Sequence, residues 1–121
     1  MEAIKNAALP CIEIYCGDPE VQLLAEAVGH GIEEEGLPYK IVMEKLTQIG
    51  AYELTKRAGL GVVATVSEER VAVFTRQLKK PGPLFDYMVT ENEKAKTIGK
   101  NAARIVKNKP FLEMEGIRCF S

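Results

Sequence analysis

Hydrophobic positions along this chain follow two periods, and each period predicts its own kind of element. Residues 11–16 alternate between apolar and polar side chains, which predicts a strand with Ile12, Ile14 and Cys16 on its inward face. Residues 19–36 carry an apolar stripe at helical spacing. That stripe is made by Val21, Leu24, Ala25, Val28 and Ile32.

The same patterns predict six further elements. Strands are expected at 39–43, 60–66, 71–75 and 84–89, a short helix at 51–58, and a last helix after residue 90. Asp18 and Pro19 are expected to start the first long helix, and Gly36 to end it. Thr90 and Glu93 have the spacing of a capping box for the last helix, whose apolar stripe includes Ala95, Ile98 and Ala102.

The order of these elements predicts the fold class. A strand, a helix and a second strand in close succession indicate a right-handed parallel crossover. The four-residue link 67–70 is too short for a crossover, so the strands that flank it should form an antiparallel hairpin. We therefore expect an α/β protein with three layers (α/β/α), built on a flavodoxin-like plan with a mostly parallel sheet and one antiparallel hairpin.

Composition sets the size and class of the protein. The 121 residues, 46% hydrophobic and 27% charged, suit a single α/β domain over 1–121, with a loose lead-in at 1–10 and a flexible tail at 113–121. A formal charge of −1 gives no general case for binding nucleic acid or an anionic membrane. Without a membrane-length apolar run or a signal-like N-terminus, a cytosolic location is expected.

Cys11, Cys16 and Cys119 lack metal-ligand spacing and are expected to be reduced and structural.

The C-terminus of the first long helix carries charges that its dipole disfavours. Glu33, Glu34 and Glu35 lie where the negative end of the helix dipole favours cations, and each exposed carboxylate there costs about 0.3–1 kcal/mol. Periodicity directs Glu34 away from the apolar stripe, in one outer column with Leu23, Ala27 and His30. Such a column is either a solvated face or a surface that meets a partner. The last helix obeys the rule, with Lys100, Arg104 and Lys107 toward its C-terminus.

The sequence contains few residues that could form a catalytic or metal site. His30 is the only histidine, which excludes a histidine-rich metal site. Cys16, between a strand and a helix N-terminus, stands where a thiolate is stabilised, but no general base is evident nearby. One glutamate can supply an oxygen ligand to Mg²⁺, although a single ligand does not make a site. Glu34 would therefore act at a metal or ion-pair contact shared with another chain.

Two blocks of the sequence resemble a known family. The block 31–38, Gly-Ile-Glu-Glu-Glu-Gly-Leu-Pro, and the block 97–107 with Pro110 and Phe111 resemble the small subunit of the reactivating factor for adenosylcobalamin-dependent diol and glycerol dehydratases. The likeness extends over about residues 12–111. It leaves the client open between glycerol and 1,2-propanediol.

The resemblance implies a non-catalytic subunit. It pairs with a large ATPase subunit, takes the place of the dehydratase medium subunit by ATP-driven exchange, and so releases damaged cobalamin. Mg²⁺ and ATP or ADP would lie at the large subunit, with Glu34 as a metal ligand in trans and Glu33 or Glu35 as substitutes. The expected partner-binding residues are Leu23, Ala27, His30, Glu33, Glu35, Lys100 and Arg104. A homodimer in isolation and enclosure in a bacterial microcompartment are further expectations.

Three alternatives remain open at this point. The dehydratase medium subunit shares the fold, but its chains are longer. A cobalamin-binding flavodoxin-like domain would need an Asp-x-His-x-x-Gly block after the first strand, and none stands there. An unrelated small α/β enzyme would use Cys16 as its nucleophile.

Overall fold

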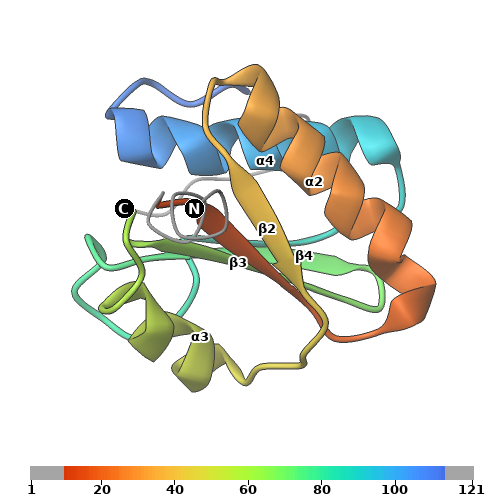
Figure 1. The fold of residues 1–121 in the computed structure, drawn as a ribbon, viewed down its shortest axis with the longest axis horizontal. Coiled ribbons are helices and arrows are strands. Elements are labelled where there is room, and N and C mark those ends of the chain that lie inside the picture. Colours follow the sequence, from red (N-terminus) through yellow and green to blue (C-terminus); the bar gives the residue numbers. More distant parts are fainter. Residues whose placement is uncertain (1–9, 114–121) are drawn as a thin grey trace, which may run out of the picture.

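The computed structural model of the chain describes residues 10–113 and contains one five-stranded sheet flanked by helices (Figure 1). The expected lead-in through residue 9 and the expected tail from residue 114, with Cys119, lie outside the described residues. The elements in chain order are β1 (Ile12–Cys16), the 3-10 helix η1 (Pro19–Val21), α2 (Gln22–Glu34), β2 (Tyr39–Val42), α3 (Gln48–Thr55), β3 (Val62–Ser67), β4 (Arg70–Thr75), β5 (Phe85–Met88) and α4 (Asn92–Lys107).

The sheet has the order β2-β1-β3-β4-β5. β1 lies between β2 and β3 and is parallel to both, which confirms the predicted crossover. β3 and β4 form the predicted antiparallel hairpin, and Glu68 in its turn has φ +53°. β5 is also antiparallel to β4, so β4 alone runs against the other four strands.

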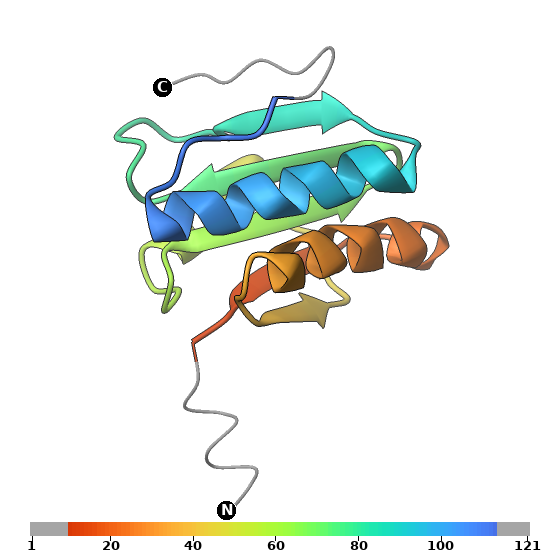
Figure 2. The same cartoon turned by 90° about the horizontal axis from the view of Figure 1, so that it is seen from above.

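The two faces of the sheet are covered by different helices. α2 and α4 lie side by side on one face, and α3 lies on the other (Figures 1 and 2). The alternation predicted for β1 is confirmed, because Ile12, Ile14 and Cys16 are buried in the core under α2 and α4. Tyr15 belongs to a second, smaller core under α3.

The predicted limits of the first long helix are confirmed, with one refinement. Asp18 caps the start by accepting a hydrogen bond from the Glu20 N–H (3.1 Å), but the first turn is the 3-10 helix and α2 begins at Gln22. Gly36 follows the C-terminus with φ +88°, a conformation that glycine adopts without a Cβ clash. The N–H groups of Gly36 and Leu37 then satisfy the carbonyls of Glu33 and Ile32.

Two local predictions were wrong. The capping box at Thr90 does not form: the residue before α4 is Glu91, which makes no side-chain cap bond. The Val89 N–H donates to the Glu69 carbonyl, so the chain stays extended up to the helix. α3 begins three residues earlier than predicted because Thr47 accepts a hydrogen bond from the Gly50 N–H (2.9 Å) and caps it.

The segment after α4 is held against the body of the protein. Asn101, 2% exposed, donates from Nδ2 to the Leu112 carbonyl (3.0 Å) and accepts at Oδ1 from the Leu112 N–H (2.7 Å). The Phe111 ring packs edge-on against Phe85 of β5, with 5.1 Å between centroids. This part of the segment therefore lies against an edge strand.

Candidate partner interface on helices α2 and α4

The crossing of α2 and α4 depends on two glycines without side chains. A Cβ built on Gly31 would lie 1.9 Å from the Lys96 carbonyl oxygen, and one on Gly99 would lie 1.9 Å from the Val28 carbonyl oxygen. The two backbones are thus in direct contact. This contact brings the ends of the two helices within reach of each other's side chains.

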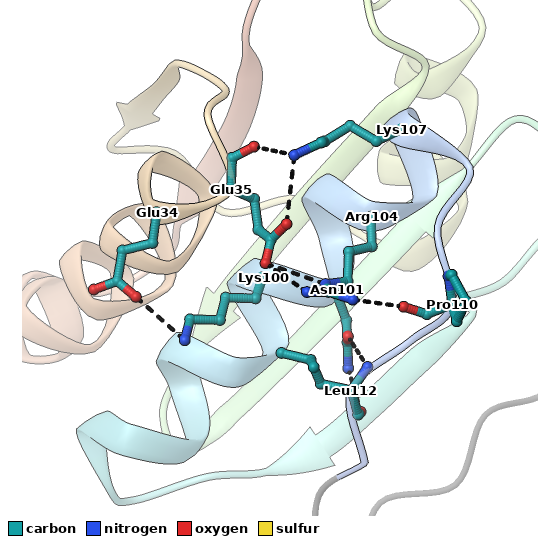
Figure 3. A network of polar contacts seen from close by, with 8 residues as sticks. All are labelled: Glu34, Glu35, Lys100, Asn101, Arg104, Lys107, Pro110 and Leu112. Atoms are coloured by element: carbon teal, nitrogen blue, oxygen red, sulfur yellow. Dashed lines mark hydrogen bonds and ion pairs between the residues drawn. The ribbon is translucent and has the colours of Figure 1, made fainter.

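Glu34 lies between two lysines of α4. Its Oε2 is 2.6 Å from Lys96 Nζ, and its Oε1 is 3.2 Å from Lys100 Nζ; Figure 3 shows the second pair. Hydrogen bonds from Lys96 and Lys100 hold the pKa of the Glu34 carboxyl below its usual value. Glu34 raises the pKa of Lys96 in turn. The Glu34 side chain remains 45% exposed, so one side of the carboxylate faces solvent.

Glu35 is held more tightly (Figure 3). Arg104 donates to Glu35 Oε2 from both Nε (3.1 Å) and Nη2 (3.0 Å), and Lys107 Nζ contacts Oε1 at 3.5 Å and the Glu35 backbone carbonyl. The Glu35 side chain is only 10% exposed. Burial alone would raise the pKa of Glu35, but the hydrogen bonds and charges of Arg104 and Lys107 outweigh burial, and the pKa is lowered.

These ion pairs correct the prediction that the carboxylates of α2 are satisfied only by another protein. Glu34 and Glu35 are paired within the chain, because α4 places four cations beside the C-terminus of α2. Lys100 and Arg104, expected to face a partner, supply two of them, and Lys96 is a residue that the sequence analysis missed. The spacing of Lys96, Lys100 and Arg104 at i, i+4 and i+8 was the available signal, since it puts all three on one helix face.

The outer column of α2 divides into exposed and covered members. The Leu23 side chain is 74% exposed, and His30 is exposed too, as is Glu33 beside the column. Ala27 is 8% exposed, so the expectation that it faces outward was wrong. Its small side chain lies at the bottom of a groove between the N-terminal halves of α2 and α4.

We call this hollow the α2–α4 groove. It encloses about 260 Å³. Leu23, Glu26, Ala27 and His30 line it from α2, and Asn92, Glu93 and Lys96 line it from α4. Glu26 and Glu93 make no ion pair within residues 10–113, and Lys96 is paired with Glu34, so these two carboxylates give the groove a negative charge. The sequence-predicted column therefore contributes to a real concavity, but as one wall of it.

Other chemistry in residues 10–113 is limited. Among these residues, no three His, Cys, Asp or Glu side chains are grouped so that they could hold a metal ion. Cys16 is 1% exposed and its thiol donates to the Asp18 carbonyl (3.2 Å), which leaves no access for a substrate. Burial and the nearby Glu13 raise the pKa of the Cys11 thiol, against the opposite effect of Lys40. Within the same residues, no helix is long and apolar enough to cross a bilayer.

Comparison with known protein families identifies relatives of this chain. Residues 9–112 match the family model of the dehydratase medium subunit. The propanediol dehydratase-reactivating factor small subunit of Citrobacter freundii is 36% identical over 86 residues, which cover 69% of this chain and 74% of that protein. The diol dehydratase-reactivating factor small subunit of Klebsiella michiganensis is 30% identical over 87 residues, covering 69% and 70% of the two chains.

Solved structures of reactivating factors contain chains with the same fold as this one. A chain of a diol dehydratase-reactivating factor complexed with ADP and Mg²⁺ superposes with a TM-score of 0.74 at 28% identity, covering 88% of this chain and 100% of that one. A chain of a glycerol dehydratase reactivase gives a TM-score of 0.73 at 22% identity, covering 86% and 97%. The second likeness concerns the fold alone.

Proposed function

This chain belongs to the dehydratase medium-subunit family, and we propose that it acts as the small subunit of a dehydratase-reactivating factor. One observation carries the proposal. A single family model covers the dehydratase medium subunit, while the curated relatives of this chain are reactivating-factor small subunits. Two proteins of one fold can occupy one position in an assembly in turn, which is the physical requirement for subunit exchange.

In this role the chain carries out no bond chemistry itself. It binds a large ATPase subunit, and it enters the dehydratase in place of the medium subunit, so that inactivated coenzyme leaves and intact coenzyme enters. The burial of Cys16 agrees with a binding role. The nucleotide and Mg²⁺ belong to the large subunit, in line with the ADP and Mg²⁺ of the related reactivating factor.

The surface proposed for partners is the exposed side of α2 and α4. Leu23, His30, Glu33 and Lys100 would touch the partner, because each keeps a share of its side chain at the surface. Ala27, Glu35 and Arg104 would support this surface from below, because their side chains lie in the groove floor or in ion pairs. In the absence of a partner, the same surface would join two copies into a homodimer.

Glu34 remains our candidate for a metal ligand in trans. Its carboxylate is half exposed, and each oxygen has a second lone pair beyond the one used by a lysine. Lys96 and Lys100 fix the direction of the carboxylate, in the way that outer-shell hydrogen bonds orient metal ligands. Since this chain offers one oxygen, the large subunit and water must supply the remaining ligands.

Two finer points complete the proposal. We group the fold with the flavodoxin-like plan in three layers, on the grounds that the strand order begins 2-1-3 and helices lie on both faces, although β4 runs against its neighbours. The proposed location is the cytoplasm, in the open or inside a bacterial microcompartment that encloses the dehydratase.

Co-purification from the native cell tests the function. A tagged chain should recover a large ATPase subunit, and the pair with ATP and Mg²⁺ should restore turnover to dehydratase inactivated by its substrate. Glu34→Gln should weaken the Mg²⁺ dependence of that complex, whereas the control Glu53→Gln, at an exposed carboxylate on α3, should not. Recovery of neither an ATPase subunit nor dehydratase chains would overturn the proposal.

A second candidate role is that of a medium subunit of the dehydratase itself, and the family model favours it. The two roles differ in what the chain needs in order to bind. A medium subunit stays with its dehydratase partners without ATP, whereas a reactivating-factor subunit requires the large subunit and nucleotide. Reconstitution of an active dehydratase from this chain and the other dehydratase subunits alone would decide for the second role.

A further inference from the structure

The α2–α4 groove continues around the end of the molecule. Asn92 lines both the groove and a second hollow, which also contacts Val21 and Val89, and the second hollow shares Glu68 and Glu69 with a third. Two large apolar side chains stand open along this path, since Leu23 is 74% and Met88 is 68% exposed. The path is therefore a row of three adjoining hollows, with the exposed apolar side chains of Leu23 at one end and Met88 at the other.

The charge around this path is one-sided. The three hollows are lined by two cations, Lys96 and Arg70, which are paired with Glu34 and Asp86. The connections at this end of the sheet, residues 17–21, 43–47, 68–69 and 89–91, contain six carboxylates against one lysine, Lys45. The carboxylates belong to Asp18, Glu20, Glu44, Glu68, Glu69 and Glu91. Glu26 and Glu93 add to this charge from the walls of the groove. A segment that binds here would lose affinity if it were acidic and gain it if it were basic.

We propose that the α2–α4 groove and its acidic rim bind an extended or helical segment of a partner protein that carries an apolar side chain flanked by lysine or arginine. The apolar side chain would lie against Leu23 and Ala27, and the basic residues would reach Glu26, Glu93 and the hairpin-turn glutamates. The inference rests on the proposed function only for the identity of the protein that bears the segment.

A second copy of this chain fits the path less well. The opposite connections, residues 35–38, 56–61, 76–84 and 108–111, are basic, with six cations (Lys56, Arg57, Arg76, Lys79, Lys80 and Lys109) against Glu35. The large hydrophobic side chains exposed within residues 10–113 are Leu23, Met43, Ile49 and Met88, and these four lie outside the basic connections. The basic end thus offers charge without an exposed anchor for the groove.

Amide chemical shifts of the isotope-labelled chain test the proposal. The probe is a short synthetic peptide with one leucine between lysines and arginines. We expect shifts confined to Leu23, Glu26, the hairpin turn and Asn92, with binding that weakens as salt rises. Leu23→Ala and the double variant Glu26→Gln/Glu93→Gln should each weaken binding about tenfold, the scale of one lost anchor or close charge pair.

Matched controls separate this site from general attraction. Glu53→Gln changes an exposed carboxylate on α3, away from the groove, and should leave binding unchanged. A peptide with glutamate in place of its basic residues should not bind. Equal binding of a leucine-free basic peptide, or shifts confined to another surface, would each overturn the proposal. Peptide binding together with failed reactivation would overturn the proposed function and leave the groove assignment standing.

Discussion

At the scale of single residues, the acidic C-terminus of α2 is explained by its neighbours in space. Glu33, Glu34 and Glu35 oppose the helix dipole, and taken alone they destabilise α2. Lys96, Lys100, Arg104 and Lys107 of α4 reverse that balance for Glu34 and Glu35. A local conflict that looked like a functional signal is therefore in part a structural contact.

Replacing Glu35 by glutamine tests this explanation. Because Glu35 is the better-buried acid and has two hydrogen bonds to Arg104, Glu35→Gln should lower the free energy of unfolding by about 1 kcal/mol, after allowance for partial solvent screening. Urea denaturation monitored by circular dichroism measures it. Glu33→Gln, at an exposed position, serves as the control and should stay close to the parent. Equal midpoints for the two variants would contradict the account.

The thiol of Cys16 gives a second test at this scale. In the folded chain it is 1% exposed and bonded to the Asp18 carbonyl, so iodoacetamide should modify it only as fast as the protein unfolds. Mass spectrometry of peptides after timed labelling, with and without urea, measures the difference. Fast labelling of Cys16 without denaturant would revive the alternative of a cysteine-dependent enzyme.

At the scale of elements, the contact between α2 and α4 depends on glycine. Gly99→Ala places a Cβ 1.9 Å from the Val28 carbonyl oxygen, so the helices must separate, at a cost of about 1–3 kcal/mol or more. The matched control is Gly50→Ala in α3, where the nearest atom is the Thr47 hydroxyl at 3.0 Å. Thermal unfolding should show a large loss for Gly99→Ala and a small change for Gly50→Ala. The reverse order would show that the helix crossing is looser than described.

The attachment of the C-terminal segment depends on one buried amide. Asn101→Ala removes both hydrogen bonds to Leu112, which should destabilise the segment by about 1–3 kcal/mol and free Phe111 from Phe85. Hydrogen exchange at the Leu112 amide should then accelerate far more than exchange in β3. Uniform acceleration across the sheet would instead mean that Asn101 supports the whole fold.

At the scale of the whole molecule, the charges of the connections between elements are opposite to the charges of the helix dipoles beside them. α2, α3 and α4 each begin at the end of the sheet where β1, β2, β3 and β5 finish. The positive ends of three dipoles therefore face the acidic connections, and the negative ends face the basic ones. This arrangement stabilises the helices.

The ion pairs across α2 and α4 predict how stability depends on pH. The lowered pKa values of Glu34 and Glu35 give stability that is complete above their unfolded-state pKa and lost as the pH falls through the folded-state values. The raised pKa of Lys96 gives stability that is complete below its unfolded-state pKa and lost as the pH rises through the folded-state value. The urea concentration at the unfolding midpoint should be constant at intermediate pH. It should fall at low pH, where Glu34 and Glu35 are protonated, and at high pH, where Lys96 loses its proton.

The variant Glu34→Gln provides the comparison for that plateau. It removes the partner of Lys96 as well as one acid, so both edges should become shallower, with the alkaline edge changing most. An unchanged alkaline edge would show that Glu34 does not determine the proton affinity of Lys96.

By itself, the sequence determined the elements and the class of the fold. Alternation in β1, the stripe of α2, and the residues Asp18 and Gly36 act over a few positions, so the local pattern is sufficient to predict them. The block from Gly31 to Pro38 was also enough to point to the family. At Thr90 the predicted cap gave way to an extended chain whose Val89 N–H bonds to the distant Glu69 carbonyl, whereas the Thr47 cap is a local bond to Gly50 that the sequence analysis did not predict.

Only the tertiary structure decided which charges remain for a partner. Glu34 and Lys96 are 62 positions apart, and no local pattern shows that two glycines bring their helices into contact. The same contact covers Ala27 and leaves Leu23 exposed, although both belong to one outer column. Periodicity gives the direction of a side chain from its own helix axis, whereas exposure depends on what other elements place there.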